Sequence, residues 1–241
     1  MQDTVYYIPI VTTALSLVFA AVVFQRYRSK DKAPYLLWWA AGIFIFGVGT
    51  FTEGFTSLFG WSEGMFRAWY ISGALLGGAP LAQGTVYLLL RRKTADRLTL
   101  LVVTFIAVAA LMVLLSPVDS SIAHDKKLSG EVLEWQWVRA FSPFINTYAF
   151  IFLVGGAAYS AIKYREKGGA TDRVWGNSLI CVGALLPGIG GTFTRMGYTE
   201  VLYVTEFVGL ILIYAGYRFN VRGRPARAAE MEPTAEPAAV G

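Results

Sequence analysis

The chain has few of the side chains that bind metals or form crosslinks. Its 241 residues include one cysteine, Cys181, and one histidine, His124. A single cysteine excludes an internal disulfide and a cysteine-based metal cluster, and a single histidine excludes a bis-histidine haem or metal site. The chain has no nucleophile elbow, because its Gly-x-Ser-x-Gly match at residues 60–64 lies between two predicted transmembrane spans and not after a strand. No long apolar segment carries two acidic residues at helical spacing. We therefore predict that the protein is not an enzyme and has no metal or other cofactor.

Charged residues are also scarce. They make up 15% of the chain, against about 25% in a typical soluble domain, while 55% of the residues are hydrophobic. Apolar runs of about 18 residues or more are long enough to cross the hydrocarbon core of a bilayer. The net charge of +5 comes from basic residues that follow these runs, so it indicates membrane orientation and not nucleic-acid binding. We predict an all-α integral membrane protein that contacts membrane lipids and no nucleic acid.

Seven long apolar segments predict a bundle of seven transmembrane helices. The first segment has too long an apolar core for a removed signal peptide, and no small-residue cleavage site follows it. The seven predicted spans are residues 5–25, 34–59, 65–90, 98–116, 133–162, 174–195 and 199–218.

Lysine and arginine are distributed very unevenly between the connecting segments. Sixteen of the 21 basic residues follow spans 1, 3, 5 or 7. The positive-inside rule places these segments in the cytoplasm. We therefore predict an external N-terminus, a cytoplasmic C-terminus and a multi-pass location in a bacterial-type inner (plasma) membrane. The sixteen residues are Arg26, Arg28, Lys30, Lys32, Arg91, Arg92, Lys93, Arg97, Lys163, Arg165, Lys167, Arg173, Arg218, Arg222, Arg224 and Arg227.

Part of the chain occurs twice. The segment Gly47–Glu53 resembles Gly188–Arg195, and the basic segment Arg26–Arg28 resembles Lys163–Arg165 at an offset of 137 residues. The second pair lies outside the apolar runs, so apolar composition alone does not force the similarity. An internal repeat fixes the architecture of a chain, and we interpret this one as a tandem duplication.

The predicted topology makes the two copies parallel, because spans 1–3 and 5–7 cross the membrane in the same sense. This gives a 3+1+3 arrangement, with span 4 as a peripheral linker helix. The composition of the tail, rich in alanine, proline and glutamate, predicts disorder. The predicted division is residues 1–92 for the first three-helix repeat, 93–130 for the linker helix and external loop, 131–220 for the second repeat, and 221–241 for the cytoplasmic tail.

Several charged residues fall in the outer half of the predicted bundle. Glu206 lies about twelve residues, or roughly 18 Å, from the cytoplasmic end of its helix. A charge at that depth costs about 2.5 kcal/mol or more unless it faces the bundle interior and is paired. We expect Glu53 and Arg195, at repeat-related positions, to be partners. The candidate ligand site or intramembrane charge network is Glu53, Arg67, Arg139, Arg195 and Glu206.

Two interpretations of this group remain open. One is an outward-facing polar pocket between the two repeats. The other is a salt-bridge network that clamps the repeats together. Glycine and proline residues occur at similar depths, in the segments 47–49, 77–80 and 187–191. They indicate either close helix packing or kinks beside a cavity.

The topology resembles two known architectures. The microbial rhodopsins also have seven helices and an external N-terminus, but they need a lysine in the seventh helix, and residues 199–218 contain none. Sugar transporters built from two three-helix repeats share the duplication and the linking helix, which implies a central substrate path; this chain lacks their Pro-Gln motif. We therefore expect a small-molecule or lipid transporter or carrier. The alternative is a non-catalytic membrane subunit, or a seven-helix sensor or receptor without covalent retinal, that acts through a protein partner or a homo-oligomer.

Overall fold

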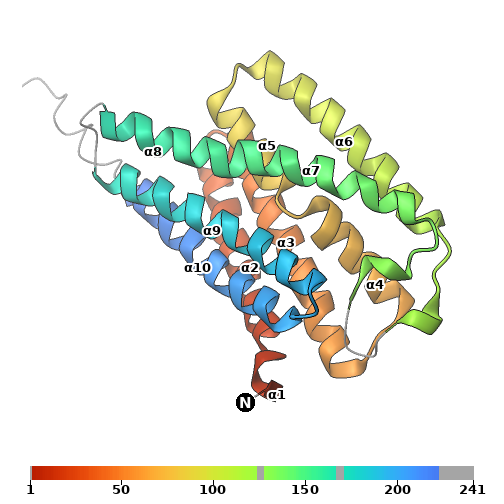
Figure 1. Ribbon diagram of the computed structural model, residues 1–241. Helices are drawn as coiled ribbons and strands as arrows, with labels where there is room; N and C mark the ends of the chain where they lie inside the picture. Colours follow the sequence, from red (N-terminus) through yellow and green to blue (C-terminus); the bar gives the residue numbers. More distant parts are fainter. Residues whose placement is uncertain (1, 124–127, 167–170, 223–241) are drawn as a thin grey trace, which may run out of the picture.

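The computed structural model describes residues 2–123, 128–166 and 171–222, without the side chains of Gln2, Asp3 and Arg195. These residues are almost entirely helical, as predicted (Figure 1). A short N-terminal helix, α1 (Gln2–Val5), precedes the long ones. His124 and most of the tail predicted to be disordered lie outside the described residues.

Within the described ranges, six helical segments are long and apolar enough to cross a membrane. This is the pattern of a multi-pass membrane protein and agrees with the predicted fold class. Five of the six are the helices α2 (Ile8–Ser29), α3 (Pro34–Phe59), α6 (Arg92–Leu115), α9 (Thr171–Arg195) and α10 (Thr199–Arg222). The sixth, residues 136–166, consists of η4 (Gln136–Ala140), α7 (Phe141–Ala149), the π-helix η5 (Phe150–Gly155) and α8 (Gly156–Glu166).

The third predicted span is present but broken. It consists of α4 (Glu63–Trp69), the π-helix η1 (Tyr70–Leu76) and α5 (Ala79–Leu89). The break falls at Gly77, whose φ of +31° is disfavoured for residues with a side chain, and Pro80 lies in the first turn of α5. The Gly-Gly-Ala-Pro sequence therefore ends one helical segment and begins the next.

Six of the seven spans form a ring. Helix α2 packs on α3, α3 on α5, and α5 on α7 and η5; α8 then packs on α9, α9 on α10, and α10 on α2 (Figure 1). Helix α6 lies outside this ring, against α5, η1 and α7. Few of its residues are buried, and Leu100, Leu101 and Leu111 are exposed. This matches the peripheral position predicted for span 4.

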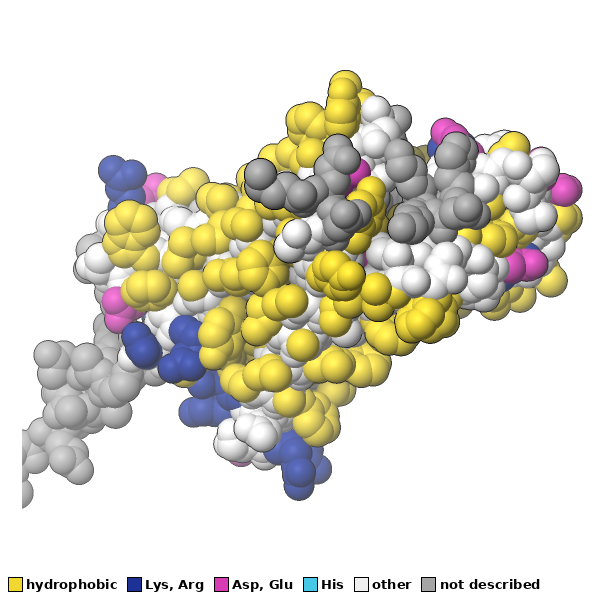
Figure 2. All heavy atoms as spheres, turned by 90° about the horizontal axis from the view of Figure 1, so that it is seen from below, with side chains coloured by type: hydrophobic (Ala, Val, Ile, Leu, Met, Phe, Trp, Pro, Cys, Tyr) yellow, Lys and Arg dark blue, Asp and Glu magenta, His cyan; other side chains and the backbone are white. Residues whose placement is uncertain are grey.

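The ends of the molecule differ in charge. In Figure 2, hydrophobic side chains cover most of the visible face, lysine and arginine gather mainly toward one end, and acidic side chains occur at both ends. The division into parallel repeats, the sidedness of the termini and the identity of the membrane stay predictions.

Candidate functional site

A cavity of about 880 Å³ lies inside the ring. Residues of all six ring spans line it, together with Leu128–Val132 of the segment before η4. Its size falls within the range of about 300–1,000 Å³ that is typical of small-molecule sites. Most of its wall is apolar, and Phe46, Leu185 and Leu202 are examples.

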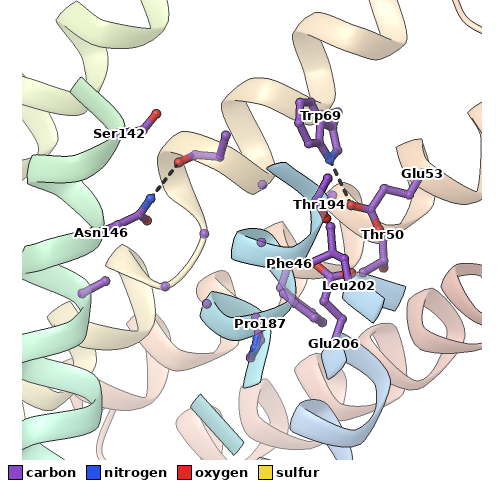
Figure 3. Close-up of a pocket in the computed structure, with 18 of the residues that line it drawn as sticks. Phe46, Thr50, Glu53, Trp69, Ser142, Asn146, Pro187, Thr194, Leu202 and Glu206 are labelled. Atoms are coloured by element: carbon purple, nitrogen blue, oxygen red, sulfur yellow. Dashed lines mark hydrogen bonds between the residues drawn. The ribbon is translucent and has the colours of Figure 1, made fainter. Parts of the chain in front are cut away.

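Two acidic side chains, Glu53 on α3 and Glu206 on α10, meet at this cavity (Figure 3). Glu53 is only 4% exposed, and its Oε1 accepts a hydrogen bond of 3.0 Å from the indole Nε1–H of Trp69. The two carboxyl groups are close enough to interact directly. Apart from this mutual contact, the atom Oε2 of each is buried and has no hydrogen-bond partner among the described residues.

This arrangement is costly unless a positive charge completes it. Two carboxylates in contact repel each other, and the low dielectric of a buried site strengthens the repulsion. Oxygen atoms that are buried without donors add the cost of lost hydration. The pair is therefore stable when it shares a proton or when a cation lies between its oxygens.

The sequence analysis left open whether the glycines indicate close helix packing or kinks beside a cavity. The structure has some glycines in close helix contacts and others on the cavity wall. A Cβ on Gly47 would approach the Ser16 side chain to 3.0 Å, and one on Gly190 would come within 2.8 Å of the Leu202 backbone. These glycines allow close helix packing. Gly188 and Gly191 line the cavity instead, and a Cβ at either position would have no atom within 4 Å. Helix α9 continues without interruption through this segment, including Pro187.

Both π-helices border the cavity. In η1, the N–H of Gly77 donates to the carbonyl oxygen of Ser72, five residues earlier. The Asn146 side chain of α7 donates to the carbonyl oxygen of Ala74 at 3.5 Å. Non-helical backbone inside a membrane is tolerated where it lines a cavity or is buried in protein, and π-bulges are frequent at functional sites.

The other predicted site residues have different positions. Arg139 lines the cavity and donates to Gln136 Oε1 at 2.7 Å. Arg67 does not join the acidic pair, because its guanidinium binds Glu63 at 2.6 Å and the carbonyl groups at the C-terminal end of α6. The side chain of Arg195, the expected partner of Glu53, lies outside what the structure describes. The pairing of Glu53 with Arg195 therefore stays a prediction; among the described side chains, Glu53 contacts Trp69 and Glu206.

The sequence analysis did not include Trp69 in the candidate site, yet its indole N–H donates to Glu53. The two residues are sixteen positions apart, on helices joined by a turn at Gly60. No local pattern marks such a pair.

A second, smaller cavity of about 270 Å³ lies toward the basic end of the ring. Its lining includes Arg26, Arg173, Asn177 and Asn220. Five apolar side chains line both cavities and form a layer between them, with one residue from each of α2, α3, α5, η5 and α10. We call them the apolar layer: Phe19, Ile43, Leu81, Leu153 and Ile213.

Over the ranges that the structure describes, no three His, Cys, Asp or Glu side chains come together as metal ligands would. No protein-family model matches the chain, and no curated protein or solved structure is significantly similar to it. The assignment of the candidate site therefore rests on the geometry of the structure alone.

Proposed function

We propose that the protein is a carrier that moves a small molecule across the membrane through the centre of the ring. The observation that supports this function is the succession of two cavities separated by the apolar layer. A carrier needs a site near the middle of the membrane, a path from each side, and a barrier that opens on one side at a time. A catalytic role is not part of this proposal.

The interruptions of the helices lie where bending would move the apolar layer, which is the barrier between the two cavities. Leu81 of the apolar layer follows the break at Gly77 by four residues, and Leu153 lies within η5. Bending at these two sites would shift both side chains without loss of the regular hydrogen bonds in α3 or α10. Alternating access in transporters commonly takes the form of rocking or hinge movements about such points.

Cysteine accessibility in proteoliposomes tests this function. In a Cys181→Ser background, Ala74→Cys places a thiol in the larger cavity, and Ser160→Cys places one in the smaller cavity. A membrane-impermeant maleimide is supplied either outside or inside the vesicles. A carrier exposes each thiol to both sides in turn, so both variants should react from either side. The control, Leu111→Cys on the outer face of α6, should react from neither.

The opposite result has a definite meaning. If Ala74→Cys reacts from one side only and Ser160→Cys only from the other, the apolar layer stays closed and carrier function is rejected. The larger cavity would then be the ligand site of a sensor or receptor.

A further inference from the structure

The acidic pair lines the larger cavity and has carboxyl oxygens without a donor among the described residues. Trp69 donates to Oε1 of Glu53, so the free acceptor of that carboxyl group is Oε2. Oε2 of Glu206 is also buried without a partner among the described residues. An ionised carboxylate only accepts hydrogen bonds, so a fully ionised pair lacks donors. A shared proton satisfies the pair without a ligand, and a cation that carries at least two N–H groups would take the place of that proton.

The lining of the cavity away from the acidic pair indicates the chemical character of the rest of the ligand. Phe46, Leu185 and Leu202 line it, as do the open positions at Gly188 and Gly191. Phe150 of η5 and Ile189 of α9 also line it, and both side chains are about half exposed. The wall between these two helices is therefore apolar. A ligand that fits this cavity has an apolar body.

We propose that Glu53 and Glu206 bind the protonated nitrogen of a lipophilic primary amine whose apolar body fills the larger cavity. The proposal rests on the proposed function and names the class of molecule that the carrier moves. An ammonium group has three N–H donors and one positive charge. It supplies a donor to each Oε2 atom and removes the repulsion between the carboxylates. A quaternary ammonium group would supply the charge but no donor.

The other charged groups on this cavity lie toward its rim. Arg139 is engaged with Gln136, and Glu131 is exposed. Glu131 lines the same cavity as the acidic pair, so Glu131→Gln is a matched control for the removal of a carboxylate.

Binding to the full-length protein in lipid nanodiscs tests the proposal, with empty nanodiscs to correct for partition into lipid. The probes are 2-(1-naphthyl)ethylammonium, its N,N,N-trimethyl derivative and the neutral alcohol 2-(1-naphthyl)ethanol, measured by titration calorimetry. We expect the primary ammonium to bind at one site and at least about tenfold more tightly than either analogue, as for a charge-assisted hydrogen bond. Glu53→Gln and Glu206→Gln should each weaken ammonium binding by about tenfold or more, whereas Glu131→Gln should leave it unchanged.

Each alternative result overturns the proposal. Equal affinity for the ammonium and the alcohol would show that the cavity does not select charge. Equal affinity for the ammonium and its trimethyl derivative would show that N–H donors are not recognised. Unchanged binding in Glu53→Gln would place the ammonium elsewhere. The comparison of probes uses the wild-type protein, so it holds even if a variant fails to fold.

The two experiments distinguish failure of the carrier proposal from failure of the amine proposal. Amine binding together with one-sided thiol labelling would reject transport but retain the amine site. Two-sided labelling without amine binding would retain transport but reject this ligand class.

Discussion

The two cavities of the ring differ in how their polar groups are satisfied. At the smaller cavity, Arg173 donates to the Tyr164 hydroxyl at 2.6 Å, and Asn177 donates to the Asn220 side chain at 3.3 Å. At the larger cavity, Glu53 and Glu206 each keep a buried oxygen without a partner in the described part of the chain. Polar groups that bond one another hold helices together, whereas buried groups without partners are costly. The polar groups at the smaller cavity therefore join its walls, whereas those at the larger cavity suit the binding site that we propose.

Two faces of α9 differ in packing. On the face toward α10, a Cβ on Gly176 would approach the Gly216 carbonyl oxygen to 2.9 Å, and one on Gly190 would come within 2.8 Å of the Leu202 backbone. On the face toward the larger cavity, a Cβ on Gly188 would have no atom within 4 Å. Helix α9 therefore packs closely on α10 and is open on its cavity face.

The largest effect is expected from Trp69→Phe. The substitution keeps an aromatic ring but removes the donor to Glu53, so it should lower the free energy of unfolding by about 2–3 kcal/mol, the cost of a hydrogen bond to a buried charged group. Thermal unfolding in nanodiscs measures the change. Trp137→Phe is the control, because Trp137 is 56% exposed, and it should have little effect. Equal effects of the two substitutions would show that the Trp69–Glu53 bond contributes nothing.

The next prediction compares two of the glycines of α9, Gly176 on the face toward α10 and Gly188 on the face toward the cavity. Gly176→Ala should destabilise the protein by about 1–2 kcal/mol, because the added methyl group meets the α10 backbone. Gly188→Ala should stabilise it by about 0.5–1 kcal/mol, since alanine favours the helix and the methyl group enters open space. Opposite shifts of the unfolding temperature would confirm the difference between the two faces. Shifts of the same sign would contradict it.

The smallest effect, but the one whose sign is most informative, is expected from Glu53→Gln. If Glu53 faces Glu206 without a cation, the amide removes repulsion and raises the free energy of unfolding by about 1 kcal/mol. If Glu53 instead belongs to a structural salt-bridge network, the same substitution destabilises the protein. Unfolding in ligand-free nanodiscs separates these cases. Glu131→Gln, at the rim, should leave the unfolding temperature unchanged.

The helices and their breaks could be predicted well from the sequence. The apolar runs predict where the spans lie, because only a helix satisfies its own backbone hydrogen bonds in lipid. The observed α3, for example, has the predicted bounds of residues 34–59. Gly77, Gly78 and Pro80 were expected to mark packing or a kink, and the structure places a break there. The basic segments predict an orientation, which stays a prediction.

The candidate site could be predicted only in part. The depth of Glu206 in its span already required that it face the interior, and Glu53 and Arg139 line the same cavity as expected of site residues. The role of Trp69, the position of Arg67 at the end of α6 and the five members of the apolar layer were not predicted. Each depends on which faces of two helices meet, and no residue spacing encodes that.

The neighbours of each helix could not be predicted because the surrounding solvent is lipid. In water, an amphipathic pattern shows which face of a helix is buried, but lipid is as apolar as the protein interior, and so most faces of these helices look alike in sequence. The amino-acid sequence by itself determined which segments are helical, where they break and how deep the charges lie. The tertiary structure, through close contacts at glycines such as Gly47, Gly176 and Gly190, decided which helices are neighbours. The resulting arrangement of helices brings the carboxyl groups of Glu53 and Glu206 together at one cavity.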